Sequence, residues 1–259
     1  MLTAKTNPFN GIIVETASLP ADPAEFQRLL AASLQAWNRN GNQVVWLDIP
    51  IERSLLIPVA VEAGFQFHHS GEDYLTLTHR LKADAFIPPF ATHYIGAGGV
   101  VINEQRELLV VSELHRRDRS RPYYKLPGGA LHPGEHVADA VIREIYEETG
   151  VRTTFDALVC FRHWHGYRYG KSDIYFICRL TPLSQTIDIH EEEIEEARWM
   201  PVNEYLNSEY VGAFNRRIVR AALESEGVIS AAVEGYDKPE THEFFMPPEI
   251  ETDGDGGIS

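Results

Sequence analysis

Hydrophobic residues in the first third of the chain follow helical spacing in some stretches and strand spacing in others. One series recurs every three or four residues and predicts the apolar face of a helix: Phe26, Leu29, Leu30, Leu34 and Trp37. Asp22-Pro23 stands just before it, with Glu25 three residues after Asp22, which is typical of a helix start. The surrounding apolar runs predict strands at 11–15, 43–49, 65–68 and 74–78, and a second helix over 55–63. Residues 11–82 are therefore expected to form a small α/β unit.

A second α/β pattern extends from residue 92 to about 228. Strands are expected at 94–102, 108–112, 157–164 and 172–180, and a closing helix at 212–224. Between the strand pairs, the run after Pro133-Gly134 has helical periodicity through Val137, Val141, Ile142 and Ile145, and Gly150 follows where a helix end favours a left-handed residue. The acidic stretch that contains Glu193, Glu195 and Glu196 is expected to be a loop. The pattern predicts a mixed sheet with flanking helices.

These patterns divide the chain into three regions: a domain over 1–90, a second over 91–230 and an acidic tail over 231–259. Pro88-Pro89 in FIPPFATH predicts a short linker between the two domains. The tail is rich in Pro and Gly and has little apolar periodicity, which predicts mobility at its end. Phe244-Phe245-Met246 is an exception, and this triplet is expected to dock on the folded body.

The stretch 129–151, GALHPGEHVADAVIREIYEETGV, has the strongest chemical pattern in the chain. Glu144, Glu147 and Glu148 stand at i, i+3 and i+4, so a helix would project all three carboxylates from one face. Crowded carboxylates repel one another and raise one another's pKa, which favours a cation among them. A site of carboxylate oxygens favours Mg²⁺ or Mn²⁺ over zinc. The guanidinium of Arg143 is expected to hold Glu135 and to orient a carboxylate of this cluster.

The alternative interpretation is a solvated acidic helix face, which is the usual meaning of a charge run. The fixed positions of Gly129, Glu135, Arg143 and Gly150 around the glutamates disfavour it. The whole stretch reads G-x5-E-x7-R-E-U-x-E-E-x-G-U, with U a bulky aliphatic residue, and it resembles the signature box of the Nudix hydrolases at every fixed position. KLPGG before the box and Glu193-Ile194 with a later Trp resemble neighbouring segments of that family.

This resemblance implies a Nudix α/β/α sandwich and a hydrolase site in the second domain. It implies metal binding by Glu144, Glu147, Glu148 and Gly129, with Arg143 and Glu193 completing the catalytic set. Candidate substrate-binding residues are Lys125, Arg162, His163 and Trp164, since cations contact phosphates and aromatic faces stack on bases. The domain order and the segments FRHWH and KSDIYFICRL resemble those of one subgroup of the family. This subgroup contains plant cytosolic ADP-ribose and NADH pyrophosphatases and the animal product of a transcript that is antisense to basic fibroblast growth factor. In that subgroup the first domain resembles part of the acetyltransferase fold, and a homodimer is expected.

The composition of the chain limits the binding partners and the cellular location that we expect. The chain has 259 residues and a net charge of −15, which argues against a sequence-independent grip on nucleic acid. It has two cysteines, too few for a disulfide framework, and free thiols are expected. No run of 18 apolar residues and no apolar leader segment is present, so no membrane partner and a cytoplasmic location are expected.

Two function classes remain open at this point. The first is an Mg²⁺-dependent diphosphatase that acts on a nucleotide-type small molecule, with ADP-ribose and NADH as first choices. Coenzyme A, FAD, sugar nucleotides and oxidised nucleotides are alternatives, because the box recognises the diphosphate and not the flanking groups. The second is a non-catalytic regulatory module that keeps the Nudix fold, which the intact carboxylate cluster disfavours.

Overall fold

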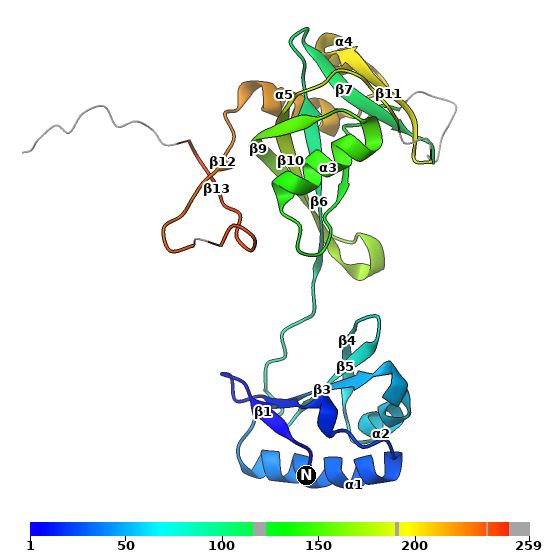
Figure 1. The fold of residues 1–259 in the computed structure, drawn as a ribbon, viewed down its shortest axis with the longest axis vertical. Coiled ribbons are helices and arrows are strands. Elements are labelled where there is room, and N and C mark those ends of the chain that lie inside the picture. Colours follow the sequence, from blue (N-terminus) through cyan, green and yellow to red (C-terminus); the bar gives the residue numbers. More distant parts are fainter. Residues whose placement is uncertain (116–122, 190–191, 237, 249–259) are drawn as a thin grey trace, which may run out of the picture. The chain divides into compact units, whose positions relative to one another are not determined.

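The computed structural model describes residues 1–115, 123–189, 192–236 and 238–248, and it divides the chain into two compact units, Met1–Thr92 and His93–Ser259 (Figure 1). The first unit has one sheet and one hydrophobic cluster, and the second unit has several sheets and two hydrophobic clusters. Within these described ranges, none of the helices is both long enough and apolar enough to cross a membrane.

The first unit is a five-stranded sheet with helices packed against it. The sheet has the order β1-β2-β3-β5-β4, and only the β2–β3 pair is parallel. Asp22 caps the first helix, accepting a hydrogen bond of 2.8 Å from the N–H of Glu25. The elements are β1 (Ala4–Thr6), β2 (Ile12–Val14), α1 (Pro23–Arg39), β3 (Val44–Pro50), α2 (Ile57–Glu62), β4 (Gln66–Ser70) and β5 (Tyr74–Arg80). Strand β1 is additional to the elements that the sequence predicts.

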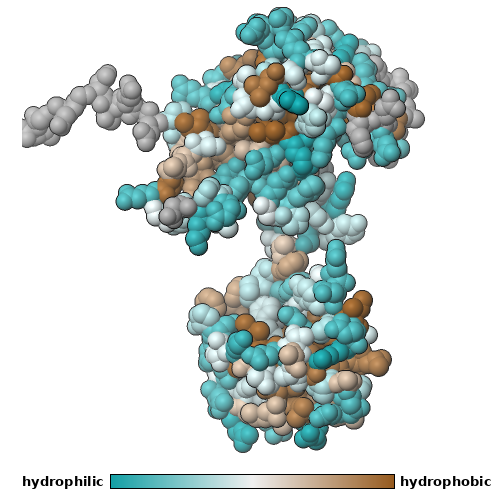
Figure 2. Space-filling model, in the orientation of Figure 1, coloured by the Kyte–Doolittle hydropathy of each residue, from teal (hydrophilic) through white to brown (hydrophobic). Residues whose placement is uncertain are grey.

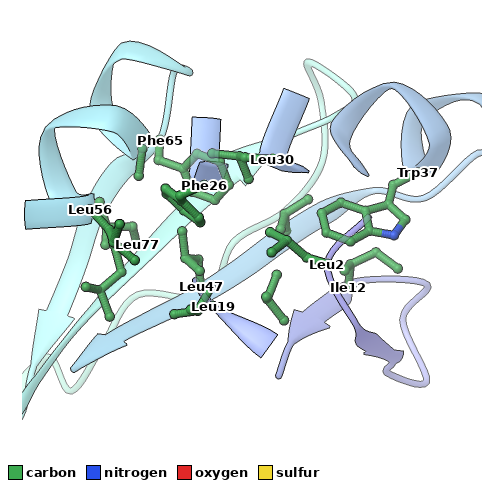
Figure 3. Close-up of a cluster of buried hydrophobic side chains, with 14 residues drawn as sticks. Leu2, Ile12, Leu19, Phe26, Leu30, Trp37, Leu47, Leu56, Phe65 and Leu77 are labelled. Carbon is green, nitrogen blue, oxygen red and sulfur yellow. The ribbon is translucent and has the colours of Figure 1, made fainter. Parts of the chain in front are cut away.

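The core of the first unit lies between α1 and the sheet (Figure 3). Phe26 and Leu30 come from the predicted apolar face of α1, and Leu47 and Leu77 come from the central strands. All four are essentially inaccessible to solvent. Burial of each such side chain stabilises the fold by about 1.5–3 kcal/mol. All residues of this cluster belong to the first unit.

The surface is mainly hydrophilic on the face shown in Figure 2, and its hydrophobic residues form separate patches. In the first unit the exposed side chains of Phe9 and Phe86 border a cavity of about 510 Å³ with Val44, Trp46 and Pro88. None of the described residues that line it is ionisable.

The second unit contains a four-stranded sheet of order β8-β6-β10-β9 and a two-stranded sheet of β11 and β7. Strands β6 and β10 are parallel, and the other pairs are antiparallel. An isolated bridge between Val111 and Lys125 joins β7 to the segment that leads into β8. The main elements are β6 (His93–Val101), β7 (Glu107–Glu113), β8 (Gly128–Ala130), α3 (Val137–Thr149), β9 (Thr153–Trp164), β10 (Ser172–Pro182), β11 (Ile194–Pro201), α4 (Val202–Asn207) and α5 (Ala213–Glu224).

Two hydrophobic clusters fix the helices of this unit to its strands. Val141 and Ile145 from the apolar face of α3 pack with Val101 and Leu180 of the larger sheet. A second cluster includes buried residues of β6, β7, β10, α4 and α5. The mixed α/β architecture agrees with the sequence prediction, and the packing of α3 leaves Glu147 exposed but buries Glu148.

One prediction for this unit was wrong. The segment with Glu195 and Glu196, expected to be a loop, forms β11 and pairs antiparallel with β7 over Ile194–Pro201. The acidic residues are on the exposed positions of the strand, while Ile194 and Met200 are buried. Pairing with a buried neighbouring strand outweighs the low strand propensity of consecutive glutamates.

The described part of the 231–259 region makes ordered contacts. Two short strands, β12 (Ile229–Ser230) and β13 (Phe245–Met246), pair antiparallel. The ring of Phe245 lies 5.4 Å from that of Phe155 in β9, as expected for the hydrophobic triplet. Residues 249–259, where mobility was predicted, lie outside the described residues.

Both cysteines are free thiols, as predicted. Burial raises the pKa of Cys178 to about 12 and also raises the pKa of the half-buried Cys160. Because the thiolate is the reactive form, we expect native protein at pH 8 to react very slowly with a disulfide reagent such as DTNB. Unfolded protein should release two equivalents of thionitrobenzoate, one for each cysteine. Fast labelling of native Cys160→Ser would contradict the buried position of Cys178.

Candidate active site

The predicted box forms a strand, a turn and a helix. Gly128–Ala130 is β8, and α3 follows from Val137 to Thr149. Gly150 ends the helix with a φ of +69°, and a side chain there would also come within 2.9 Å of Asp188. Both facts favour glycine at this position.

The three box glutamates differ in their exposure to solvent. The side chain of Glu147 is 55 % exposed, that of Glu144 is 16 % exposed and that of Glu148 is 9 % exposed. Burial raises the pKa of Glu148, and Glu144 adds to the rise, while Lys125 and the N–H of Gly128 oppose it. A buried carboxylate of raised pKa gains more from a nearby cation than an exposed one does.

Arg143 connects the start of the box to its glutamates. Its Nε and Nη2 donate to the two carboxylate oxygens of Glu135 at 2.7 and 2.8 Å, the bidentate pair that the sequence predicts. Its Nη1 donates to Glu144 and Glu147, at 2.9 Å in each case. The hydrogen bonds from Arg143 hold the pKa of Glu135 down at about 2. One guanidinium thus positions three carboxylates.

Lys125 occupies the other side of the cluster. Its Nζ lies 2.6 Å from Oε1 of Glu113 and 3.4 Å from Oε1 of Glu148. Burial lowers the pKa of Lys125, but the carboxylates of Glu148 and Glu113 outweigh that effect, and the net pKa is raised. The N–H of Gly128 donates to Oε2 of Glu148 at 2.8 Å. Lys125 therefore remains a cation beside the most buried glutamate.

The cluster fits a divalent cation by its chemistry. Its donors are carboxylate oxygens, and a side chain at Gly129 would come within 2.5 Å of the Glu144 carboxylate, so glycine keeps this space open. In the described part of the chain, no three His, Cys, Asp or Glu side chains converge as a preformed metal site. The carboxylates are instead held by Arg143 and Lys125, with which a metal ion would compete.

A cavity of about 480 Å³ opens beside this cluster. Gly128, Gly129 and Lys125 form part of its wall, which places it next to the box carboxylates. The rest of the wall is rich in tyrosines and cations, and it consists mainly of Tyr94, Tyr167, Tyr169, Tyr175, Arg162 and Arg168. Such a wall suits a ligand that carries both phosphates and flat rings.

Arg162 is fixed within this wall. It forms an ion pair with the buried Asp173 on the adjacent strand β10. Its guanidinium also lies 5.3 Å from the ring centroid of Trp164 and 5.4 Å from that of Tyr175. Arg162 and Trp164 are two residues apart on β9 and therefore share a face of the strand.

Trp164 is half exposed and is not among the described residues that line the cavity. Two further predicted residues lie elsewhere. His163 is between Arg162 and Trp164 in β9, so strand alternation directs it to the opposite face. There its Nε2 is 2.9 Å from Nε2 of His93. Glu193 is exposed, and its backbone carbonyl accepts a hydrogen bond of 2.8 Å from Leu114.

Glu113, Asp173 and Tyr175 also belong to the site, although they are not among the residues that the sequence predicts. Glu113 ends an otherwise apolar strand, so its place at the strand end is a weak sequence signal. For Asp173 and Tyr175 the sequence gives no signal, because their places in the site depend on the pairing of β9 with β10.

Comparison with known proteins agrees with this geometry. Residues 92–222 match the NUDIX domain family, and residues 2–81 match a family described as Nudix hydrolase domain. Nudix hydrolase 2 of Arabidopsis thaliana is 41% identical over 82% of this chain and 76% of its own length. Nucleoside diphosphate-linked moiety X motif 6 of Homo sapiens is 37% identical over 92% of this chain and 75% of its own.

Nudix hydrolase 8 of Arabidopsis thaliana is 39% identical over 80% of this chain, which spans only 56% of that protein. The matched family covers the carboxylate helix, the cavity and the strands that position them. The chain therefore belongs to the Nudix hydrolase family.

Proposed function

We propose that the chain is an Mg²⁺-dependent hydrolase that cleaves the diphosphate of a nucleoside diphosphate linked to another moiety. The observation that carries this proposal is the position of the carboxylate cluster beside a cavity walled by tyrosines and cations. A diphosphate at Gly128 and Gly129 would place its two substituents along the aromatic wall. The name of the human relative, which refers to a nucleoside diphosphate-linked moiety, supports the same substrate class.

Glu144, Glu147, Glu148 and the backbone of Gly129 would hold the cation. Bound there, the ion would neutralise charge on the diphosphate and would lower the pKa of the attacking water. Water adds to one phosphorus, the bond from that phosphorus to the bridging oxygen breaks, and each product leaves as a monophosphate. Lys125 and Arg162 supply positive charge near the phosphates, which a chain of net charge −15 needs to attract an anion.

ADP-ribose and NADH are the substrates we place first. Each has a diphosphate between two ribosyl groups and at least one flat base, so each matches a cavity with cations and tyrosines. The products would be AMP with ribose 5-phosphate, or AMP with reduced nicotinamide mononucleotide.

A substrate panel with Mg²⁺ tests this proposal. ADP-ribose and NADH are expected to give the highest kcat/KM against coenzyme A, FAD, a sugar nucleotide and an oxidised nucleoside triphosphate, with products identified by chromatography. EDTA should abolish turnover, and added Mg²⁺ should restore it. Release of pyrophosphate from a triphosphate as the preferred reaction would overturn the substrate class. Tight binding of ADP-ribose without turnover would indicate a regulatory module instead.

A further inference from the structure

The first turn of the carboxylate helix α3 lacks a cap of its own. The residue before it, His136, makes no side-chain hydrogen bond to the helix. The first N–H groups of a helix have no partner within the helix and carry a partial positive charge. These N–H groups therefore take an acceptor from water or from another part of the chain.

Glu243, from the C-terminal segment, supplies that acceptor. Its Oε2 accepts from the N–H of Val137 at 2.8 Å, and its Oε1 accepts from the N–H of Ala138 at 3.1 Å. Nearby, the Nε2–H of His136 donates to the carbonyl of Pro239 at 2.6 Å. The carboxylate thus caps the helix from 106 residues away in sequence.

Contacts on both sides of Glu243 hold the segment in place. On the N-terminal side, Val228 exchanges two backbone hydrogen bonds of 2.9 Å with Leu158 of β9. On the C-terminal side, Phe245 in β13 contacts Phe155 of the same strand (the orange-red hairpin of Figure 1). The segment is therefore tied to β9 at two places, and Glu243 lies between them.

We infer that Glu243 is a positioning residue for the carboxylate site, an inference that rests on the proposed hydrolase function. The capped turn begins two residues after Glu135. Both carboxylate oxygens of Glu135 accept hydrogen bonds from Arg143. Arg143 in turn holds Glu144 and Glu147. Because Glu243 fixes the start of α3, it also helps to position the nearby Glu135–Arg143 pair. Through Arg143 it then helps to position Glu144 and Glu147.

Glu243→Ala and Glu243→Gln in the full chain test this inference, with Glu240→Gln as the matched control. Glu240 is an exposed carboxylate in the same segment, and among the hydrogen bonds and ion pairs of the described residues none joins its side chain to α3. Hydrogen exchange of the Val137 and Ala138 amides should accelerate about fivefold in Glu243→Ala, as for the loss of a helix cap. With ADP-ribose, kcat should fall severalfold and the Mg²⁺ concentration for half-maximal rate should rise, while KM changes little.

Glu243→Gln keeps one carbonyl acceptor, so its amide exchange rates and its kcat should lie between those of Glu243→Ala and those of wild type. Glu240→Gln should match wild type in both measurements. A lower Tm in Glu243→Ala with unchanged kcat and Mg²⁺ dependence would reduce Glu243 to a structural cap and overturn the inference. Unchanged amide exchange would also overturn it. If wild type hydrolyses no substrate, the proposed function fails, whereas the exchange measurement still reports whether Glu243 caps the helix.

Discussion

Replacing Glu148 by Gln is expected to reduce kcat by about a hundredfold or more, because electrostatic stabilisation at a reacting centre commonly contributes about 3–4 kcal/mol. Glu148 is the most buried of the three box glutamates, and it faces Lys125 and the N–H of Gly128. Glutamine keeps the volume but removes the charge that a cation needs. Steady-state rates with ADP-ribose at saturating Mg²⁺ measure the effect.

Two further variants separate loss of charge at the site from loss of folding. Glu147→Gln removes a carboxylate that is 55 % exposed, so its activity should fall with little change in Tm. Asp139→Asn removes an exposed charge from the first turn of the same helix and should leave kcat near the wild-type value. Full activity of Glu148→Gln, or of wild type in EDTA, would exclude a role for this cluster as the metal site.

Local sequence was sufficient to predict the parts of the site that lie within α3 and in the turn just before it. The spacing of Glu144, Glu147 and Glu148, and the pairing of Arg143 with Glu135, follow from helix geometry and from the reach of a guanidinium. The same spacing did not reveal how unequal the glutamates are. Only the packing of α3 against β8 and Lys125 makes Glu148 buried and leaves Glu147 in solvent.

The parts of the site and of the fold that the sequence did not predict depend on contacts between residues that are distant in sequence. Asp173 meets Arg162 because β10 pairs with β9 in one register, and a shift of one residue would direct Asp173 to the other face. Glu243 lies in a segment whose composition predicts little structure, yet it caps α3. Strand β11 was missed for the same reason, since pairing with β7 decides its structure.

Arg143→Lys is expected to lower kcat by about 10–100-fold, the usual cost of losing a residue that orients metal ligands. The guanidinium of Arg143 makes four hydrogen bonds to three carboxylates. A lysine keeps the charge but cannot form the bidentate pair with Glu135 while it also reaches Glu144 and Glu147. Because Arg143 is assigned to the glutamates and not to the substrate, kcat should fall more than KM rises.

Acid unfolding provides an independent measure of the same contact. The pKa of Glu135 is lowered from 4.5 to about 2, so its pair with Arg143 stabilises the fold fully above pH 4.5 and loses that effect as the pH falls toward 2. The free energy of unfolding of Glu135→Gln should therefore vary less between pH 4.5 and 2 than that of wild type, and Arg143→Lys should behave in the same way. A rise in KM with unchanged kcat in Arg143→Lys would instead identify Arg143 as a substrate-binding residue.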